Sequence, residues 1–117
     1  TSVAHDSHNI IAAGDSDADI ALAVNRLRQI GGGYVLVKKG ALVGEVPLPV
    51  AGLMSTAPHE EVGQATAELL QKAADMGIPY YIDPFISLSF LALPVIPSIR
   101  LTDLGLFDVD EFALVER

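Results

Sequence analysis

Residues 9–38 read NIIAAGDSDADIALAVNRLRQIGGGYVLVK, and no other part of the chain indicates its secondary structure so clearly. The apolar run 9–13 predicts a strand. Ser16 then stands where a helix N-cap belongs, and four apolar residues follow at helical spacing: Ile20, Val24, Leu27 and Ile30. Gly31 ends this helix, and the run of β-branched and apolar residues at 34–38 predicts a second strand. A strand, a helix and a strand in this order favour a right-handed unit with parallel strands.

A hairpin is expected directly after this unit. Lys39-Gly40 supplies a tight turn, and residues 41–46 return as the antiparallel partner of residues 34–38. The sheet would then be mixed, because the hairpin adds an antiparallel pair to a parallel one. Gly31-Gly32-Gly33 follows a helix and precedes a strand, which is the reverse of a phosphate-binding loop, so we interpret it as a helix cap.

Two further helices are expected in the rest of the chain. Ser55 or Thr56 begins the first of them, which ends at Gly77. Asp83-Pro84 pairs an N-cap with proline at the first helical position, and it predicts a short helix over residues 85–93 that is apolar on nearly every side. Short strands are expected at residues 78–82, 99–101 and 112–115, with a turn at residues 103–105.

The 117 residues suit one α+β domain, residues 1–117, with helices packed on a mixed β-sheet. The net charge of −8 argues against nucleic acid or an anionic membrane as a partner. Polar residues and prolines interrupt the apolar stretch 85–99, which falls short of the roughly 18 apolar residues of a membrane helix. We therefore expect a cytoplasmic protein without a membrane partner.

The richest cluster of functional side chains lies near the beginning of the chain: His5, Asp6, Ser7, His8 and Asn9. In an extended segment Asp6 and His8 share one face, which makes them the preferred pair for contacting a substrate or a metal-bound water. The alternative is structural, because Asp, Ser and Asn often satisfy the backbone of turns. Two histidines are also too few for a metal centre, so no metal is expected within this chain.

Motifs spread over nearly the whole chain carry a resemblance to a known family. They are SVAHDSHN at residues 2–9, AVNR at 23–26, GGG at 31–33, LPVAGLMS at 48–55, DPF at 83–85, LSFLALPVIP at 88–97, LTD at 101–103 and GLFD at 105–108. In this order they resemble the C-terminal domain of bacterial adenine deaminases of the amidohydrolase superfamily.

The resemblance implies an intact enzyme of purine salvage that hydrolyses adenine to hypoxanthine and ammonia. It implies a manganese or iron centre, which activates water, in a β/α barrel that lies before this region. The barrel and its metal ligands have no counterpart here, so the chain is expected to be an inactive fragment. Its expected partners are the missing barrel of the same protein and further copies in a homo-oligomer.

Two other functions remain open from the sequence. The domain could be a purely structural or oligomerisation module, with no residue near the substrate. It could also be an independent small-molecule binding domain, which would require a closed polar pocket built from these residues alone. His59, in the polar first turn of the second helix, is expected to be solvated.

Overall fold

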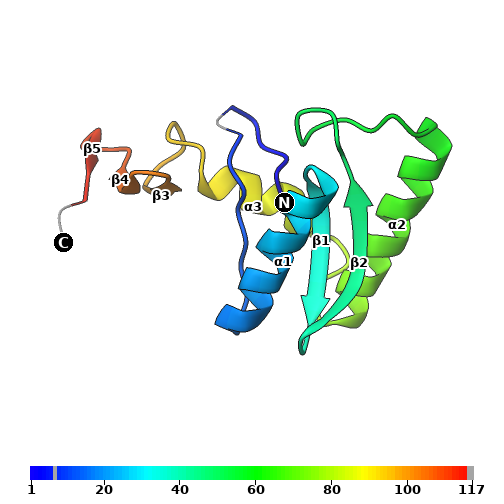
Figure 1. Cartoon of the computed structure of the whole chain (residues 1–117). Helices are drawn as coiled ribbons and strands as arrows, with labels where there is room; N and C mark the ends of the chain where they lie inside the picture. The colour runs from blue at the N-terminus through cyan, green and yellow to red at the C-terminus, as the bar shows by residue number, and fades with distance from the viewer. Residues whose placement is uncertain (7, 116–117) are drawn as a thin grey trace.

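The computed structural model describes residues 1–6 and 8–115. Its centre is a hairpin of β1 (Gly33–Lys38) and β2 (Ala41–Pro47), with α1 (Asp17–Ile30) beside β1 and α2 (His59–Asp75) beside β2. Figure 1 shows the hairpin between these two helices, with α3 (Pro84–Leu91) behind α1 and extending to the left of it. Strands β3 (Ile99–Thr102), β4 (Gly105–Asp108) and β5 (Ala113–Leu114) form a separate small sheet at the C-terminal end.

The helix ends follow the sequence signals closely. The backbone N–H of Asp19 donates to Ser16 Oγ at 3.3 Å, and Gly31 takes the left-handed conformation (φ 79°) that ends α1. Asp83 Oδ1 accepts from the backbone N–H groups of Phe85 and Ile86, which begins α3 as predicted. The second helix, α2, begins later than predicted, because Pro58 is its N-cap and the preceding residues, including Ser55 and Thr56, lie outside it.

The two faces of the hairpin contact different helices. The core cluster on one face joins Val46 and Leu48 to Leu69 of α2 and Phe85 of α3. Tyr34 stacks on Phe85 with ring centroids 4.9 Å apart, which places α3 on the same face. Because side chains alternate along a strand, the neighbouring pair Val35 and Glu45 turns to the opposite face, toward α1.

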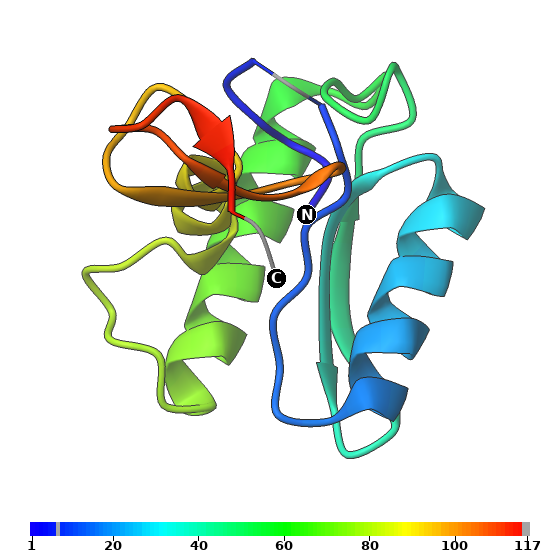
Figure 2. The ribbon, with the colours of Figure 1, turned by 90° about the vertical axis from the view of Figure 1, so that its left-hand side faces the viewer.

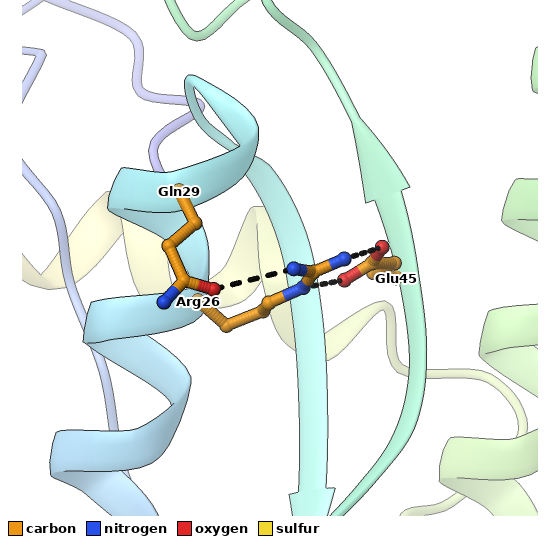
Figure 3. A network of polar contacts seen from close by, with 3 residues as sticks. All are labelled: Arg26, Gln29 and Glu45. Atoms are coloured by element: carbon orange, nitrogen blue, oxygen red, sulfur yellow. Dashed lines mark hydrogen bonds and ion pairs between the residues drawn. The ribbon is translucent and has the colours of Figure 1, made fainter.

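A bidentate ion pair joins α1 to β2 on that opposite face. Arg26 Nε lies 2.6 Å from Glu45 Oε2, and Arg26 Nη2 donates to Glu45 Oε1 at 2.7 Å. Arg26 Nη1 also donates to Gln29 Oε1 at 3.2 Å, so the guanidinium is held from two sides (Figure 3). The pair therefore adds a charged contact between α1 and the hairpin to the apolar packing of that helix.

The α+β class is confirmed, but the predicted mixed sheet is wrong. Strand pairs in the described part of the chain are all antiparallel, and residues 9–13 form no strand there. These residues run alongside β1 without joining it (Figure 2). An apolar run becomes a strand only when a neighbour accepts and donates its backbone hydrogen bonds, and periodicity does not reveal that neighbour.

The C-terminal region differs from the prediction in two places. Residues 78–82 form no strand, and β4 was not predicted, although the turn before it was. The register of β4 places Leu101 opposite Leu106 and Phe107 opposite Leu114, so β4 is the middle strand of its sheet. No helix within residues 1–6 and 8–115 is long and apolar enough to cross a membrane.

Candidate functional site

The polar cluster lies on a loop whose two ends are hydrogen-bonded to each other. The amino nitrogen of Thr1 donates to the carbonyl of Ile11 at 2.9 Å, and the Ile11 N–H returns a bond of 2.9 Å to the Thr1 carbonyl. Both residues are buried. The loop therefore starts and ends at one fixed point in the fold.

Ser2 fixes this end of the loop to two other segments. Its hydroxyl donates to the Gly52 carbonyl at 2.7 Å and accepts from the Gly33 N–H at 2.8 Å. Its own N–H donates to the Gly33 carbonyl at 3.1 Å. Ser2 is buried, so each of these bonds satisfies a polar group that has little access to water.

The glycines around Ser2 make this convergence possible. A Cβ on Gly32 would lie 2.6 Å from both Ser2 Oγ and the Gly52 Cα, and one on Gly33 would lie 2.0 Å from the Val46 carbonyl oxygen. The helix-cap interpretation of residues 31–33 is confirmed for Gly31. Gly32 and Gly33 have a further role that the sequence did not indicate, since they let three backbone segments approach closely.

The outer part of the loop presents its polar side chains to solvent. His5, Asp6, His8 and Asn9 are all exposed, and Ser7 lies outside the described residues. The His5 ring lies 4.3 Å, centroid to centroid, from the ring of Phe90 in α3, at an interplanar angle of 42°. This contact gives the imidazole a defined place against α3 and leaves the ring accessible.

The preferred pair is not bonded in this state of the chain. Within residues 1–6 and 8–115, no hydrogen bond or ion pair links Asp6 to His8, and the backbone bends at residues 5 and 6 instead of forming a strand. Asp6 and His8 were expected to share one face only if the segment is extended. Because the observed loop bends there, that expectation does not apply to it. Whether the side chains contact a substrate stays a prediction.

The described residues do not provide a metal centre. Within them, no group of three or more His, Asp or Glu side chains is arranged to hold a metal ion. His59 lies away from the loop and is solvated as predicted, with a side chain that is 92% exposed beside Glu60. The loop offers hydrogen bonding and proton transfer by its imidazole and carboxylate groups.

Sequence reasoning identified the loop but missed what holds it. Ser2 and Phe90 stand inside the motifs that carry the family resemblance, yet neither was assigned a role. Ser2 is separated by 31 residues from Gly33 and by 50 from Gly52, and contacts at such distances leave no periodic pattern in a single sequence.

Comparison with known proteins identifies the family of this fold and loop. The model of a family described as the adenine deaminase C-terminal domain matches residues 1–113. The chain belongs to this family. An adenine deaminase of Brucella melitensis is 52% identical to this member over 115 residues, and one of Dehalococcoides mccartyi is 56% identical over the same number. An adenine deaminase of Bacillus subtilis is 52% identical over 112 residues.

The matches cover nearly all of this chain and a small part of each relative. The Brucella and Dehalococcoides alignments span 98% of the chain and 20% of the relative, and the Bacillus alignment spans 96% and 19%. The chain therefore corresponds to about a fifth of the length of the relatives.

Proposed function

We propose that this domain is the C-terminal part of an enzyme that hydrolyses adenine to hypoxanthine and ammonia. The proposal is supported by more than 50% identity to three proteins named adenine deaminase. In the reaction, a water oxygen bonds to the purine carbon that bears the amino group, and that group leaves as ammonia. The enzyme would act in purine salvage in the cytoplasm.

The metal of such an enzyme would be held outside this domain. The described residues do not fit a manganese or iron site, because they present no set of three metal ligands. We assign no step that passes through a metal to any residue of this chain. The metal-binding barrel would belong to the remaining four-fifths of the protein, which is this domain's first partner.

The role we assign to the domain is to bring the loop between Thr1 and Ile11 to the edge of the active site. The observation that carries this role is the contrast between the two parts of the loop. Its ends are bonded to each other and, through Ser2, to Gly33 and Gly52, while its outer part presents an imidazole and a carboxylate to solvent. Polar groups on a rigidly anchored loop suit ligand binding or proton transfer.

A structural role is the second candidate, and a different observation favours it. Phe90, Leu91 and Val95 are exposed around α3, which suits packing on the rest of the protein or on a second copy in a homo-oligomer. An independent small-molecule binding domain has less support. The groove lined by Ile11, Leu27, Val35 and Phe85 is mainly apolar, whereas that function would require a closed polar pocket.

A chimera tests the proposed function. In the Bacillus subtilis adenine deaminase, the matched 112-residue region is replaced by this chain. We expect the chimera to release hypoxanthine from adenine, and we expect the same enzyme without this region, and the 117-residue chain alone, to be inactive. A folded chimera without activity, or metal-dependent hypoxanthine release by the isolated chain, would contradict the proposal.

Single replacements in an active chimera then test the loop. His5→Ala, Asp6→Asn and His8→Ala are each measured for turnover and melting temperature. A residue that contacts the substrate or a metal-bound water is expected to lower turnover by about a hundredfold, the scale of a lost acid–base group, with little change in melting temperature. His59→Ala is the matched control, since this exposed histidine lies on another element. Loss of stability with unchanged turnover per folded molecule would show that the loop is structural.

A further inference from the structure

A groove of about 420 Å³ separates residues 11–14 from β1. Its two sides are formed by Ile11 to Gly14 and by Val35 to Val37, and Leu27 of α1 and Phe85 of α3 also line it. Figure 2 shows residues 9–14 running alongside the hairpin over the length of β1. The groove thus lies between two extended segments, with one helix on each side.

Within residues 1–6 and 8–115, no other strand pairs with the edge of β1 that faces this groove. In an antiparallel hairpin, successive residues point their backbone groups alternately toward the partner strand and away from it. Gly33 points away from β2, because its carbonyl accepts from the N–H of Ser2. Val35, two residues further on, therefore presents its N–H and C=O to the groove.

Val35 is buried, which makes an unpaired backbone costly there. Val35 is 7% exposed and lies opposite Glu45 of β2 in the register of the hairpin. Within residues 1–6 and 8–115, no other segment forms a backbone hydrogen bond with it on the side of the groove. A buried N–H or C=O without a partner has given up its hydrogen bonds to water without gaining one in the protein, which is unfavourable. An open strand edge beside an apolar groove fits a further strand, which would satisfy these groups and fill the space.

Thr1 and Ser2 already occupy one end of this position. Thr1 exchanges two backbone hydrogen bonds with Ile11 on one side, and Ser2 bonds to Gly33 of β1 on the other. Thr1 also lines the groove. These two residues therefore lie between the two extended segments, as the end of a strand between them would.

We propose that the groove binds the segment that directly precedes the Thr1 position in the full-length protein, as a central strand. The matched family is a C-terminal domain that covers 20% of its relatives, so the relatives continue on the N-terminal side of this position. The inserted strand runs antiparallel both to residues 11–14 and to β1. The inference rests on the family assignment and is independent of adenine hydrolysis.

The proposal fixes the register and the chemistry of the inserted strand. Continuing the alternation of Thr1 and Ser2, the residue before Thr1 bonds to Val35 and the one before that bonds to Ala13. The side chains of the strand turn alternately toward Leu27 and Phe85, which are both apolar and buried. A strand covered on both faces is apolar at nearly every position, and we expect that composition here.

Disulfide formation tests this register in a full-length protein. In the Brucella melitensis adenine deaminase, the matched 115 residues are replaced by this chain, which has no cysteine of its own, and native cysteines are changed to serine. Ala13→Cys is combined with cysteine at the second position before Thr1. Directly opposite residues in a hydrogen-bonded pair lie about 5.5 Å apart between Cα atoms, within the range of a disulfide. We expect mild oxidation to join the two cysteines of one chain in a disulfide, so that neither thiol stays free.

The control variant moves the partner cysteine to the first position before Thr1, where its side chain points to the other face and the thiols stay free. Absence of the disulfide in a protein with an unchanged melting temperature would overturn the proposal. A disulfide between two chains would also overturn it, because a second copy would then fill the groove. The same cysteine pair is placed at the aligned positions of the unmodified relative, so that the test does not depend on the folding of the chimera.

Discussion

At the scale of single residues, Ser2 links segments that lie far apart in the sequence. Its hydroxyl both donates to Gly52 and accepts from Gly33, so it uses the two hydrogen-bonding capacities that distinguish serine from alanine. The side chain adds almost no apolar packing. Its contribution to the fold is therefore the satisfaction of buried backbone groups.

This bonding predicts the effect of Ser2→Ala. The replacement leaves the Gly33 N–H and the Gly52 carbonyl without their side-chain partner, and we expect it to lower the free energy of unfolding by about 1–3 kcal/mol. Urea unfolding followed by circular dichroism measures the change. Ser87→Ala is the control, because Ser87 is exposed on α3 and its replacement is expected to change stability by less than about 0.5 kcal/mol. Equal stabilities of the two variants would show that the Ser2 hydroxyl is not needed for the fold.

At the scale of elements, the helices were predictable because their signals are local. Ser16 and Asp83 cap the helices that follow them, and Gly31 takes the left-handed conformation at the end of α1. The β1–β2 hairpin was predictable for the same reason, since its turn and both strands adjoin in sequence. Each of these elements depends on residues within a few positions of one another.

Whether an apolar run becomes a strand depends on a partner segment that cannot be identified from the run itself. Residues 9–13 have the composition of a buried strand, but no ladder forms beside them in the described chain. If the proposed strand fills the groove, the prediction failed only because its partner lies outside this sequence. The candidate loop was also predictable only in its local features. Its residues were identified by their chemical types, whereas its attachment through Ser2, Gly33 and Gly52 arises only in the fold.

The ion pair between α1 and β2 predicts how stability changes with pH. The hydrogen bonds from Arg26 hold the pKa of the Glu45 carboxyl below its usual value of 4.5. A carboxyl group with a lowered folded-state pKa contributes stability that is fully present above its unfolded-state pKa. That contribution is lost as the pH falls through the folded-state pKa.

Glu45→Gln is therefore expected to be less stable than the parent chain at neutral pH, and the difference should shrink as the pH falls below about 4.5. Urea midpoints measured between about pH 3 and pH 7 report this difference. Because the Arg26 side chain is 36% exposed, added salt should also reduce it. Glu111→Gln, at an exposed position near the C-terminal end, is the control and should leave the midpoint unchanged. A difference that is constant over the whole pH range would contradict the assigned role of the pair.

At the scale of the whole molecule, the segment around α3 divides between the core and the surface. Phe85 and Ala92 are buried, while Phe90, Leu91 and Val95 are 42%, 46% and 69% exposed. A helix that is apolar on nearly every side, as the sequence predicts here, has more apolar surface than one face of a small domain covers, which accounts for this division. The exposed part is the surface on which we expect another copy or the rest of the enzyme to pack.

This surface predicts that the isolated chain self-associates. Sedimentation velocity over a range of concentrations should show a shift toward larger species, because association removes apolar area from water. The double variant Phe90→Ser with Val95→Ser should shift the equilibrium back toward monomer. Leu104→Ser is the matched control, since Leu104 is 78% exposed but lies in the turn between β3 and β4. If the parent chain stays monomeric at high concentration and binds no dye specific for exposed apolar surface, the α3 segment does not drive association, and its exposed residues would have to be explained by contacts within the full-length protein.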